Sequence, residues 1–326
     1  MTKENTNPFD DIRDLVASLP KPQETASAAV KARLETAASG LRPLGRLDES
    51  VAWLAGWQGK EEPEIKTPLV AVFVGTHSVA KAVTGTDPVV EAKLRVEAVS
   101  NGKTAVRNIA AAQGAAFKIY EMGLEYPSAD MRTEASLSER ACAQAIAFGM
   151  EVVSEGADLI AIGNAGVGTA TAAAGIARGL YGGAAQYWAG GLGDVAEKRI
   201  EAVGIATHFH KSILTNPLEI LRCFGGRDIA GMVGAILAAR HQRIPVVLDG
   251  FAVCAAAAIL HGLNPNALDH CYAAHITSEP AHGALLDRIG KKPLLDLGLG
   301  IGDGSGAALA IGILKSAAAG SRELSD

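Results

Sequence analysis

The sequence has few aromatic residues, few cysteines and no excess of positive charge. Phenylalanine, tryptophan and tyrosine together make up only 5% of its 326 residues. The four cysteines, Cys142, Cys223, Cys254 and Cys271, form no C-x-x-C pair and lie in apolar stretches, so we expect neither a disulfide framework nor a zinc site. The 35 acidic residues outnumber the 30 basic residues, which argues against a protein that binds nucleic acid through bulk charge.

No segment has the pattern of a membrane helix or a secretory signal. The longest uncharged run, residues 159–177, contains an asparagine, two threonines and four glycines, and therefore predicts a buried strand, a loop and a helix. The beginning of the sequence is polar and acidic and lacks the apolar core of a signal peptide. We therefore expect a cytoplasmic protein, with reduced cysteines and no membrane partner.

Small side chains are abundant instead. Alanine and glycine account for 60 and 37 of the 326 residues, and 48% of the residues are hydrophobic. This hydrophobic content is enough for a large core, which excludes intrinsic disorder. Because no Gly-X-Y period is present, a collagen-like protein is excluded as well. The composition therefore predicts closely packed helices joined by glycine-rich loops.

Buried strands alternate with helical segments along most of the chain. Apolar runs typical of buried strands occupy residues 69–74, 157–163 and 244–250, and a fourth apolar stretch begins at residue 293. The segment CYAAHI, residues 271–276, is another plausible strand. Helical patterns separate them, so we predict an α/β fold with a Rossmann-like parallel sheet covered by helices. Helical patterns over residues 7–58 and a charged, proline-containing stretch after them predict an N-terminal helical segment, 1–66, and an α/β body, 67–326. We expect the N-terminal segment to form a smaller helical subdomain together with the C-terminal segment.

Glycine-rich or polar loops follow the predicted strands, where ligands bind in such folds. These loops cover residues 75–79, 163–169, 189–194, 277–282 and 302–306. His77 is either a structural histidine or a group that faces a ligand. Asp303 is either a partner of a helix N-terminus or a catalytic carboxylate. The glycine order in 163–169 does not fit the dinucleotide fingerprint, although glycines there suit a phosphate, and no metal-binding motif is present.

Several of these segments, taken together, resemble one enzyme family. Residues 216–260, SEPAH at 278–282 and PLLDLGLGIGDGSGAALAI at 293–311 resemble nicotinate-nucleotide–dimethylbenzimidazole phosphoribosyltransferase and keep its order. The resemblance implies transfer of a phosphoribosyl group from nicotinate mononucleotide to 5,6-dimethylbenzimidazole in cobalamin biosynthesis. It also implies a homodimer and a reaction without metal or redox cofactor.

The resemblance assigns roles to residues of the glycine loops. Asp303 lies where the family's G-E-G-[ST]-G-A motif has its catalytic glutamate, and Asn164 replaces the glutamate of the family's G-E-M-G-I-G-N-T-T loop. Lys198 matches the family's phosphate-contacting lysine. With the loops described above, these matches give the predicted substrate-binding residues: Gly75, His77, Ser78, Gly163, Asn164, Gly166, Gly168, Thr169, Gly191, Lys198, Ser278, Glu279, Gly302 and Ser305.

The two altered glutamates leave alternatives open. Aspartate is one methylene shorter than glutamate, and a misplacement of about 1 Å can lower a rate roughly 100-fold. Asp303 can still act as a base, whereas Asn164 can only orient a ring or a hydroxyl group. These alternatives are a non-catalytic nucleotide-binding homologue and the same transferase with a different benzimidazole or purine acceptor. The alternation of strands and helices separately suggests an NAD-dependent dehydrogenase. The glycine order argues against the dehydrogenase.

Overall fold

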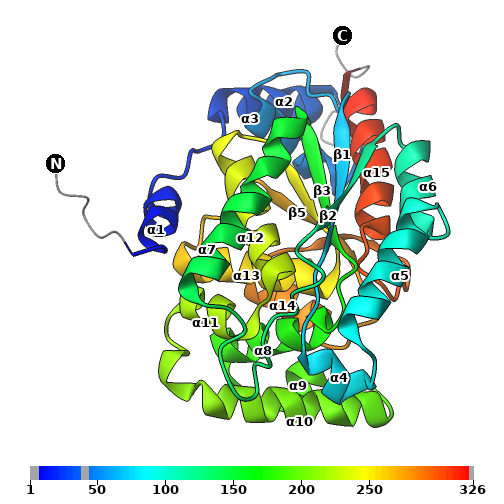
Figure 1. Cartoon of the computed structure of the whole chain (residues 1–326). Helices are drawn as coiled ribbons and strands as arrows, with labels where there is room; N and C mark the ends of the chain where they lie inside the picture. The colour runs from blue at the N-terminus through cyan, green and yellow to red at the C-terminus, as the bar shows by residue number, and fades with distance from the viewer. Residues whose placement is uncertain (1–6, 38–43, 323–326) are drawn as a thin grey trace.

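The computed structural model describes residues 7–37 and 44–322 and contains a six-stranded parallel sheet (Figure 1). The strands are β1 (Pro68–Val74), β2 (Ala116–Glu121), β3 (Leu159–Asn164), β4 (Val246–Leu248), β5 (Cys271–Ile276) and β6 (Pro293–Asp296). Their order is β2-β1-β3-β4-β5-β6, and every neighbouring pair is parallel. The predicted α/β class with a parallel sheet covered by helices is confirmed.

Helices follow or precede almost every strand. Before β1 lie α1 (Asp10–Ala17), α2 (Glu24–Ala37) and α3 (Leu47–Gln58). The first half of the sheet is connected by α4 (Val79–Thr84), α5 (Pro88–Ser100), α6 (Ala105–Ala112), α7 (Glu139–Met150) and the 3-10 turn Glu151–Glu155. The second half contains α8 (Thr169–Tyr181), α9 (Ala185–Ala189), α10 (Asp194–Phe209), the 3-10 turn Lys211–Ile213, α11 (Pro217–Phe224), α12 (Arg227–His241), α13 (Gly250–Leu263), α14 (His282–Arg288) and α15 (Ser305–Arg322).

The sheet is buried on both faces because successive side chains of its central strands enter two different clusters. In β1, Leu69, Ala71 and Phe73 pack in the cluster that includes α7, α8, α12 and α13. Val70 and Val72 pack in the cluster that includes α6 and α15. Figure 1 shows these two helical layers on opposite sides of the sheet. Fully buried strands of this kind read as continuous apolar runs, which explains why β1 and β3 are visible in the sequence.

Strand β2 is the one strand of the described chain that the sequence did not predict. It forms an edge of the sheet, and its side chains are mostly exposed or half-buried. Its sequence, AFKIYE, therefore lacks a continuous apolar run. Strand β4 is also shorter than the predicted strand over 244–250, because helix α13 already begins at Gly250.

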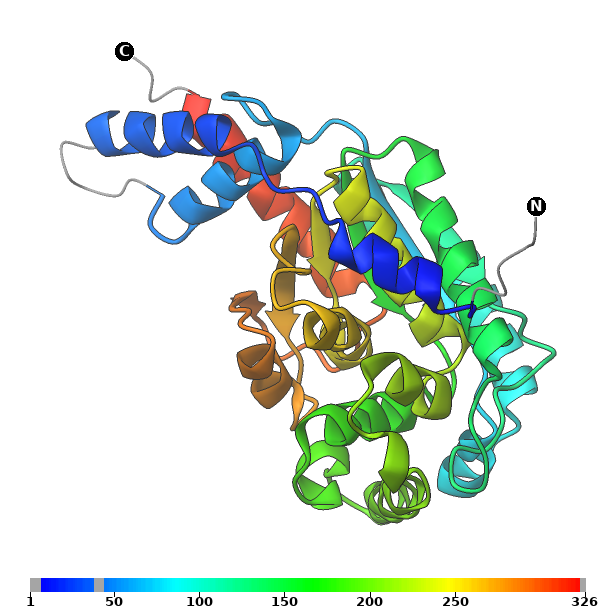
Figure 2. The same cartoon turned by 90° about the vertical axis from the view of Figure 1, so that its left-hand side faces the viewer.

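The N-terminal helices pack in two places. Phe9, Ile12 and Val16 of the α1 region belong to the main core, whereas α2 and α3 form a small cluster with Ala317 of α15. Figure 2 shows α2 and α3 beside the C-terminal half of α15, away from the sheet. The domain boundary near residue 66 stays a prediction. No helix within the described ranges is long and apolar enough to span a membrane.

Candidate active site

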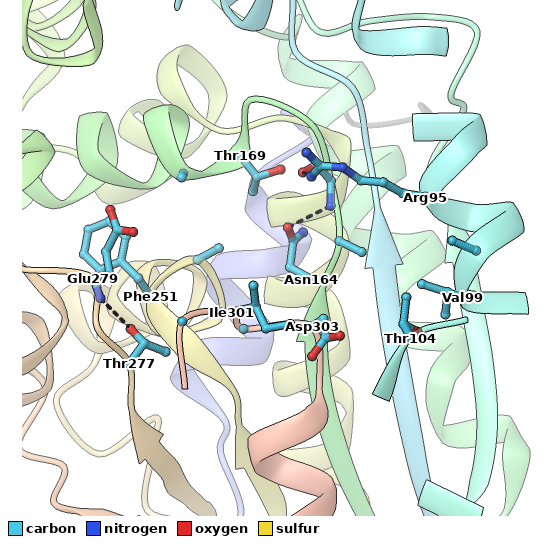
Figure 3. A pocket seen from close by; sticks show the side chains of 17 residues that line it. Arg95, Val99, Thr104, Asn164, Thr169, Phe251, Thr277, Glu279, Ile301 and Asp303 are labelled. Carbon is cyan, nitrogen blue, oxygen red and sulfur yellow. Dashed lines mark hydrogen bonds between the residues drawn. The ribbon is translucent and has the colours of Figure 1, made fainter. Parts of the chain in front are cut away.

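A cavity of about 400 Å³ opens at the carboxyl ends of strands β3 to β6 (Figure 3). Its volume lies in the range of small-molecule sites. In Figure 3, Arg95, Val99 and Thr104 of the α5–α6 region lie opposite Phe251, Thr277 and Glu279, and Asn164 and Asp303 lie between the two groups. The complete lining is Arg95, Ala98, Val99, Thr104, Asn164, Ala165, Gly166, Thr169, Ala170, Phe251, Ala252, Thr277, Glu279, Gly300, Ile301, Gly302 and Asp303.

Asp303 reaches the cavity from the loop formed by residues 302–306, which we call the Asp303 loop. Its side chain is only 8% exposed, and its Oδ1 accepts a hydrogen bond of 3.0 Å from the Ser305 N–H at the start of α15. The loop is pressed against the end of β3, where Asn164 N–H donates to Gly302 O over 2.8 Å. A Cβ at Gly163 would lie 2.3 Å from Gly304 N, so this close approach requires a glycine. The backbone thus fixes the position of the carboxylate.

Asn164 is held by a buried network under the other side of the cavity. Its Nδ2 donates to Asp228 Oδ2 over 2.9 Å, and its Oδ1 accepts from Gly166 N–H over 3.0 Å. The Thr169 hydroxyl also donates to Asp228 Oδ2, over 2.7 Å. The amide group of Asn164 therefore has a fixed orientation, and it retains one N–H and one oxygen lone pair for a ligand.

Asp228 is the centre of that network and is fully buried. His77 Nε2 lies 2.9 Å from Asp228 Oδ1, whereas Asn164 and Thr169 donate to Oδ2. Burial by itself raises the pKa of the Asp228 carboxyl, but His77 and the hydrogen bonds from Asn164 and Thr169 lower this pKa to about 2. Asp228 is therefore ionised at neutral pH and holds its partners through charge-assisted hydrogen bonds.

A second buried aspartate–histidine pair lies under the Asp303 loop. Asp249 follows β4, His275 lies on β5, and their Oδ1 and Nε2 atoms are 2.6 Å apart. Burial raises the pKa of Asp249. Burial lowers the pKa of His275, but the adjacent Asp249 carboxylate outweighs this and raises it. The pKa of each group is therefore higher than its ordinary value.

Charged side chains also mark two sides of the cavity. Glu279 is held by Arg199 of α10, with 2.8 Å between Oε1 and Nη1. Arg95 is the one cation among the described lining residues, and its guanidinium donates to Gly166 O over 2.8 Å. No group of three or more His, Cys, Asp or Glu side chains in residues 7–37 and 44–322 is arranged to hold a metal ion.

The structure brings six of the predicted site residues to the cavity and leaves the others outside its lining. The six are Asn164, Gly166, Thr169, Glu279, Gly302 and Asp303. Three others belong to the same loops but do not line the cavity: Gly163, Gly168 and Ser305. Two are buried elsewhere, Gly75 and His77, and Ser78 precedes α4. The remaining three are exposed: Gly191, Lys198 and Ser278. His77 thus contacts Asp228 rather than the cavity.

Sequence reasoning did not identify several residues of this region. Arg95 lies on α5, Thr104 immediately precedes α6, and Phe251 is the second residue of α13; none of them belongs to the predicted glycine loops. Asp228 contributes through its contact with Asn164, which is 64 positions away in the sequence, and Asp249 through its contact with Gly304, which is 55 positions away. Asp249 carried one signal, since it follows a buried strand directly and precedes a glycine.

Comparisons with known proteins agree with this architecture. A family model described as phosphoribosyltransferase matches residues 19–326. The nicotinate-nucleotide–dimethylbenzimidazole phosphoribosyltransferase of Brucella canis is 48% identical over 316 residues, which cover 95% of this chain and 93% of the relative. The protein of that name from Brucella melitensis biotype 1 is 47% identical over the same lengths. A crystal structure of the enzyme from Thermus thermophilus superposes with a TM-score of 0.83 at 28% identity and covers 91% of this chain and 96% of that one.

Proposed function

The chain belongs to the nicotinate-nucleotide–dimethylbenzimidazole phosphoribosyltransferase family, and we propose that it transfers the phosphoribosyl group of nicotinate mononucleotide to 5,6-dimethylbenzimidazole. The products are nicotinate and α-ribazole 5′-phosphate, an intermediate of cobalamin biosynthesis. The observation that carries this proposal for the site is a carboxylate, Asp303, on the wall of a cavity of about 400 Å³ at the carboxyl end of the sheet.

Asp303 is the proposed general base. A nitrogen of the acceptor forms a bond to C1 of the ribose while the bond from C1 to the nicotinate nitrogen breaks. The electron pair of that bond neutralises the pyridinium, so the leaving group needs no acid. The acceptor must lose its ring proton, and a carboxylate within hydrogen-bond reach can take it. The Ser305 N–H fixes one oxygen of Asp303 and leaves the other for this role.

The remaining cavity residues are proposed to hold the substrates. Thr169 and Ala170 begin helix α8 at the cavity wall, and backbone N–H groups at a helix N-terminus bind phosphate. We assign the 5′-phosphate to this end, with Arg95 as a nearby cation. The fixed amide of Asn164 and the carboxylate of Glu279 are available to orient the ribose and the ring, which supports in-line attack.

A homodimer is also proposed. Large apolar side chains are exposed on α9 and α10, namely Tyr187, Val195, Ile205 and Phe209. Ile205 and Phe209 are four residues apart and share one face of α10, and apolar patches of this kind mark interaction surfaces. Sedimentation should give twice the mass of the chain, and Ile205→Glu should shift it towards monomer. A monomer at all concentrations would contradict this. The cytoplasmic location stays a prediction.

A product analysis tests the activity itself. The protein is incubated with nicotinate mononucleotide and, in parallel, with 5,6-dimethylbenzimidazole, other benzimidazoles, purines and phenols, and the products are identified by mass spectrometry. The proposal expects nicotinate release together with α-ribazole 5′-phosphate. Binding of nicotinate mononucleotide without any product from any acceptor would contradict it, whereas a product with another base only would change the acceptor.

A further inference from the structure

The Asp249–His275 pair supports the Asp303 loop from below and lies outside the cavity. Both side chains are fully buried, and neither lines the cavity. Asp249 Oδ2 accepts a hydrogen bond of 2.5 Å from the N–H of Gly304, the residue directly after Asp303. A Cβ at Gly306 would lie 2.2 Å from His275 Cδ2 and 2.7 Å from Asp249 Oδ1. The loop therefore rests on the pair with no room between them.

We propose that Asp249 and His275 are positioning residues for the phosphoribosyl transfer, which hold the Asp303 carboxylate in place through the Gly304 N–H. This inference rests on the proposed function. Because Asp249 is fully buried, no water can replace it as the partner of the Gly304 N–H if this hydrogen bond is lost, which makes Asp249 a firm anchor for the loop. His275 Nε2 lies 2.6 Å from Asp249 Oδ1, so the fully buried Asp249 side chain is flanked by the imidazole on one side and by the Asp303 loop on the other.

The shorter side chain at position 303 makes this anchor important. The family resemblance places a glutamate there, and an aspartate has one rotatable bond fewer to adjust its reach. The position of its carboxylate is then set by the backbone of the Asp303 loop. Because a displacement of about 1 Å can lower a rate roughly 100-fold, the group that holds the peptide between Asp303 and Gly304 affects the chemical step without contact with the substrate.

A second ion pair of the fold serves as a matched control. Asp269 lies just before β5, at the opposite end of the sheet from the cavity, and its Oδ2 is 3.5 Å from the guanidinium of buried Arg240. Asp269 is half-exposed, and it contacts a buried basic side chain, as Asp249 does. Asp269 has no contact with the Asp303 loop in the described structure. Loss of either carboxylate should lower stability, but only loss of Asp249 should alter catalysis.

The experiment compares Asp249→Ala and Asp249→Asn with Asp269→Ala and Asp269→Asn in the complete chain. For Asp249→Ala we expect kcat to fall about 10- to 100-fold, with the affinity for nicotinate mononucleotide, measured by calorimetry, within about 3-fold of the wild type. Asp249→Asn keeps an oxygen for the Gly304 N–H but places an amide NH2 group opposite His275, so a smaller fall in kcat, about 3- to 10-fold, should remain. Both Asp269 variants should keep the wild-type kcat, with a lower unfolding midpoint.

Hydrogen exchange gives a readout that needs no activity. Amide hydrogens in peptides that contain residues 302–306 should exchange faster in Asp249→Ala than in the wild type. In Asp269→Ala their exchange rate should equal that of the wild type. A wild-type kcat in both Asp249 variants, or unchanged exchange, would overturn the positioning role. If Asp249→Ala does not fold, Asp249→Asn decides: a kcat about 3- to 10-fold lower supports the proposal, and an unchanged kcat refutes it. Absence of product from the wild type would instead refute the proposed function.

Discussion

Gly163 does not line the cavity, but it packs against the Asp303 loop. A substitution at Gly163 should therefore impair catalysis by displacing Asp303. In Gly163→Ala, the new Cβ would lie 2.3 Å from Gly304 N, whereas ordinary contacts begin at 3.4 Å. The two groups must therefore separate by about 1.1 Å. Since a displacement of about 1 Å can lower a rate roughly 100-fold, we expect kcat to fall by about that factor. Overpacking of this kind also costs about 1–3 kcal/mol of stability.

Steady-state kinetics with a quantified nicotinate product, together with thermal unfolding, measures both effects. Gly204→Ala is the matched control, because a Cβ at this position on α10 would meet nothing within 4 Å. An alanine in a helix is up to about 1 kcal/mol more stable than a glycine, so this control should be at least as stable as the wild type and equally active. A folded Gly163→Ala variant with a kcat within about 3-fold of the wild type would refute the idea that the backbone at residue 163 sets the position of Asp303.

Two further predictions concern the charged groups around the cavity. The pKa of Asp228 is about 2 in the folded protein, against an ordinary value of 3.8. The ionised form of Asp228 therefore stabilises the fold above pH 4 by about 2 kcal/mol. This contribution is lost as the pH falls from 4 to 2. The difference in unfolding free energy between the wild type and Asp228→Asn, measured by denaturant titration, should shrink over that range, and a constant difference would contradict the assignment. Arg199→Lys should loosen Glu279 and raise the KM for nicotinate mononucleotide about 10-fold, as expected for the loss of a charged hydrogen bond worth about 1.4 kcal/mol, with little change in kcat; a normal KM would remove Glu279 from the binding site.

Much of the fold could be predicted from the sequence because its central strands are buried on both faces. Strands β1 and β3 are continuous apolar runs that end at glycine-rich or polar loops, and these features alone indicate a parallel sheet with a site at its carboxyl edge. Strand β2 escaped prediction, since an exposed edge strand has no such run. The extent of burial, rather than strand propensity, decided which strands could be predicted from the sequence.

The candidate site could be predicted only in its local parts. Asp303 and Asn164 stand in glycine loops after strands, so their neighbours along the chain indicate their place. Asp228 and Asp249 act through partners 64 and 55 residues away, and no local pattern contains that information. The sequence left two interpretations of His77 open, and the contact with Asp228 explains why a polar histidine is buried there.

The most direct test of the account is the activity of Asp303→Asn. This substitution keeps the size of the side chain and an acceptor for the Ser305 N–H but removes the base. We expect kcat to fall about 100- to 10,000-fold, the usual contribution of a general base, while nicotinate mononucleotide still binds. Asp296→Asn, at an exposed aspartate on β6, should leave kcat unchanged. A kcat for Asp303→Asn equal to that of the wild type would contradict the assignment of Asp303 as the base.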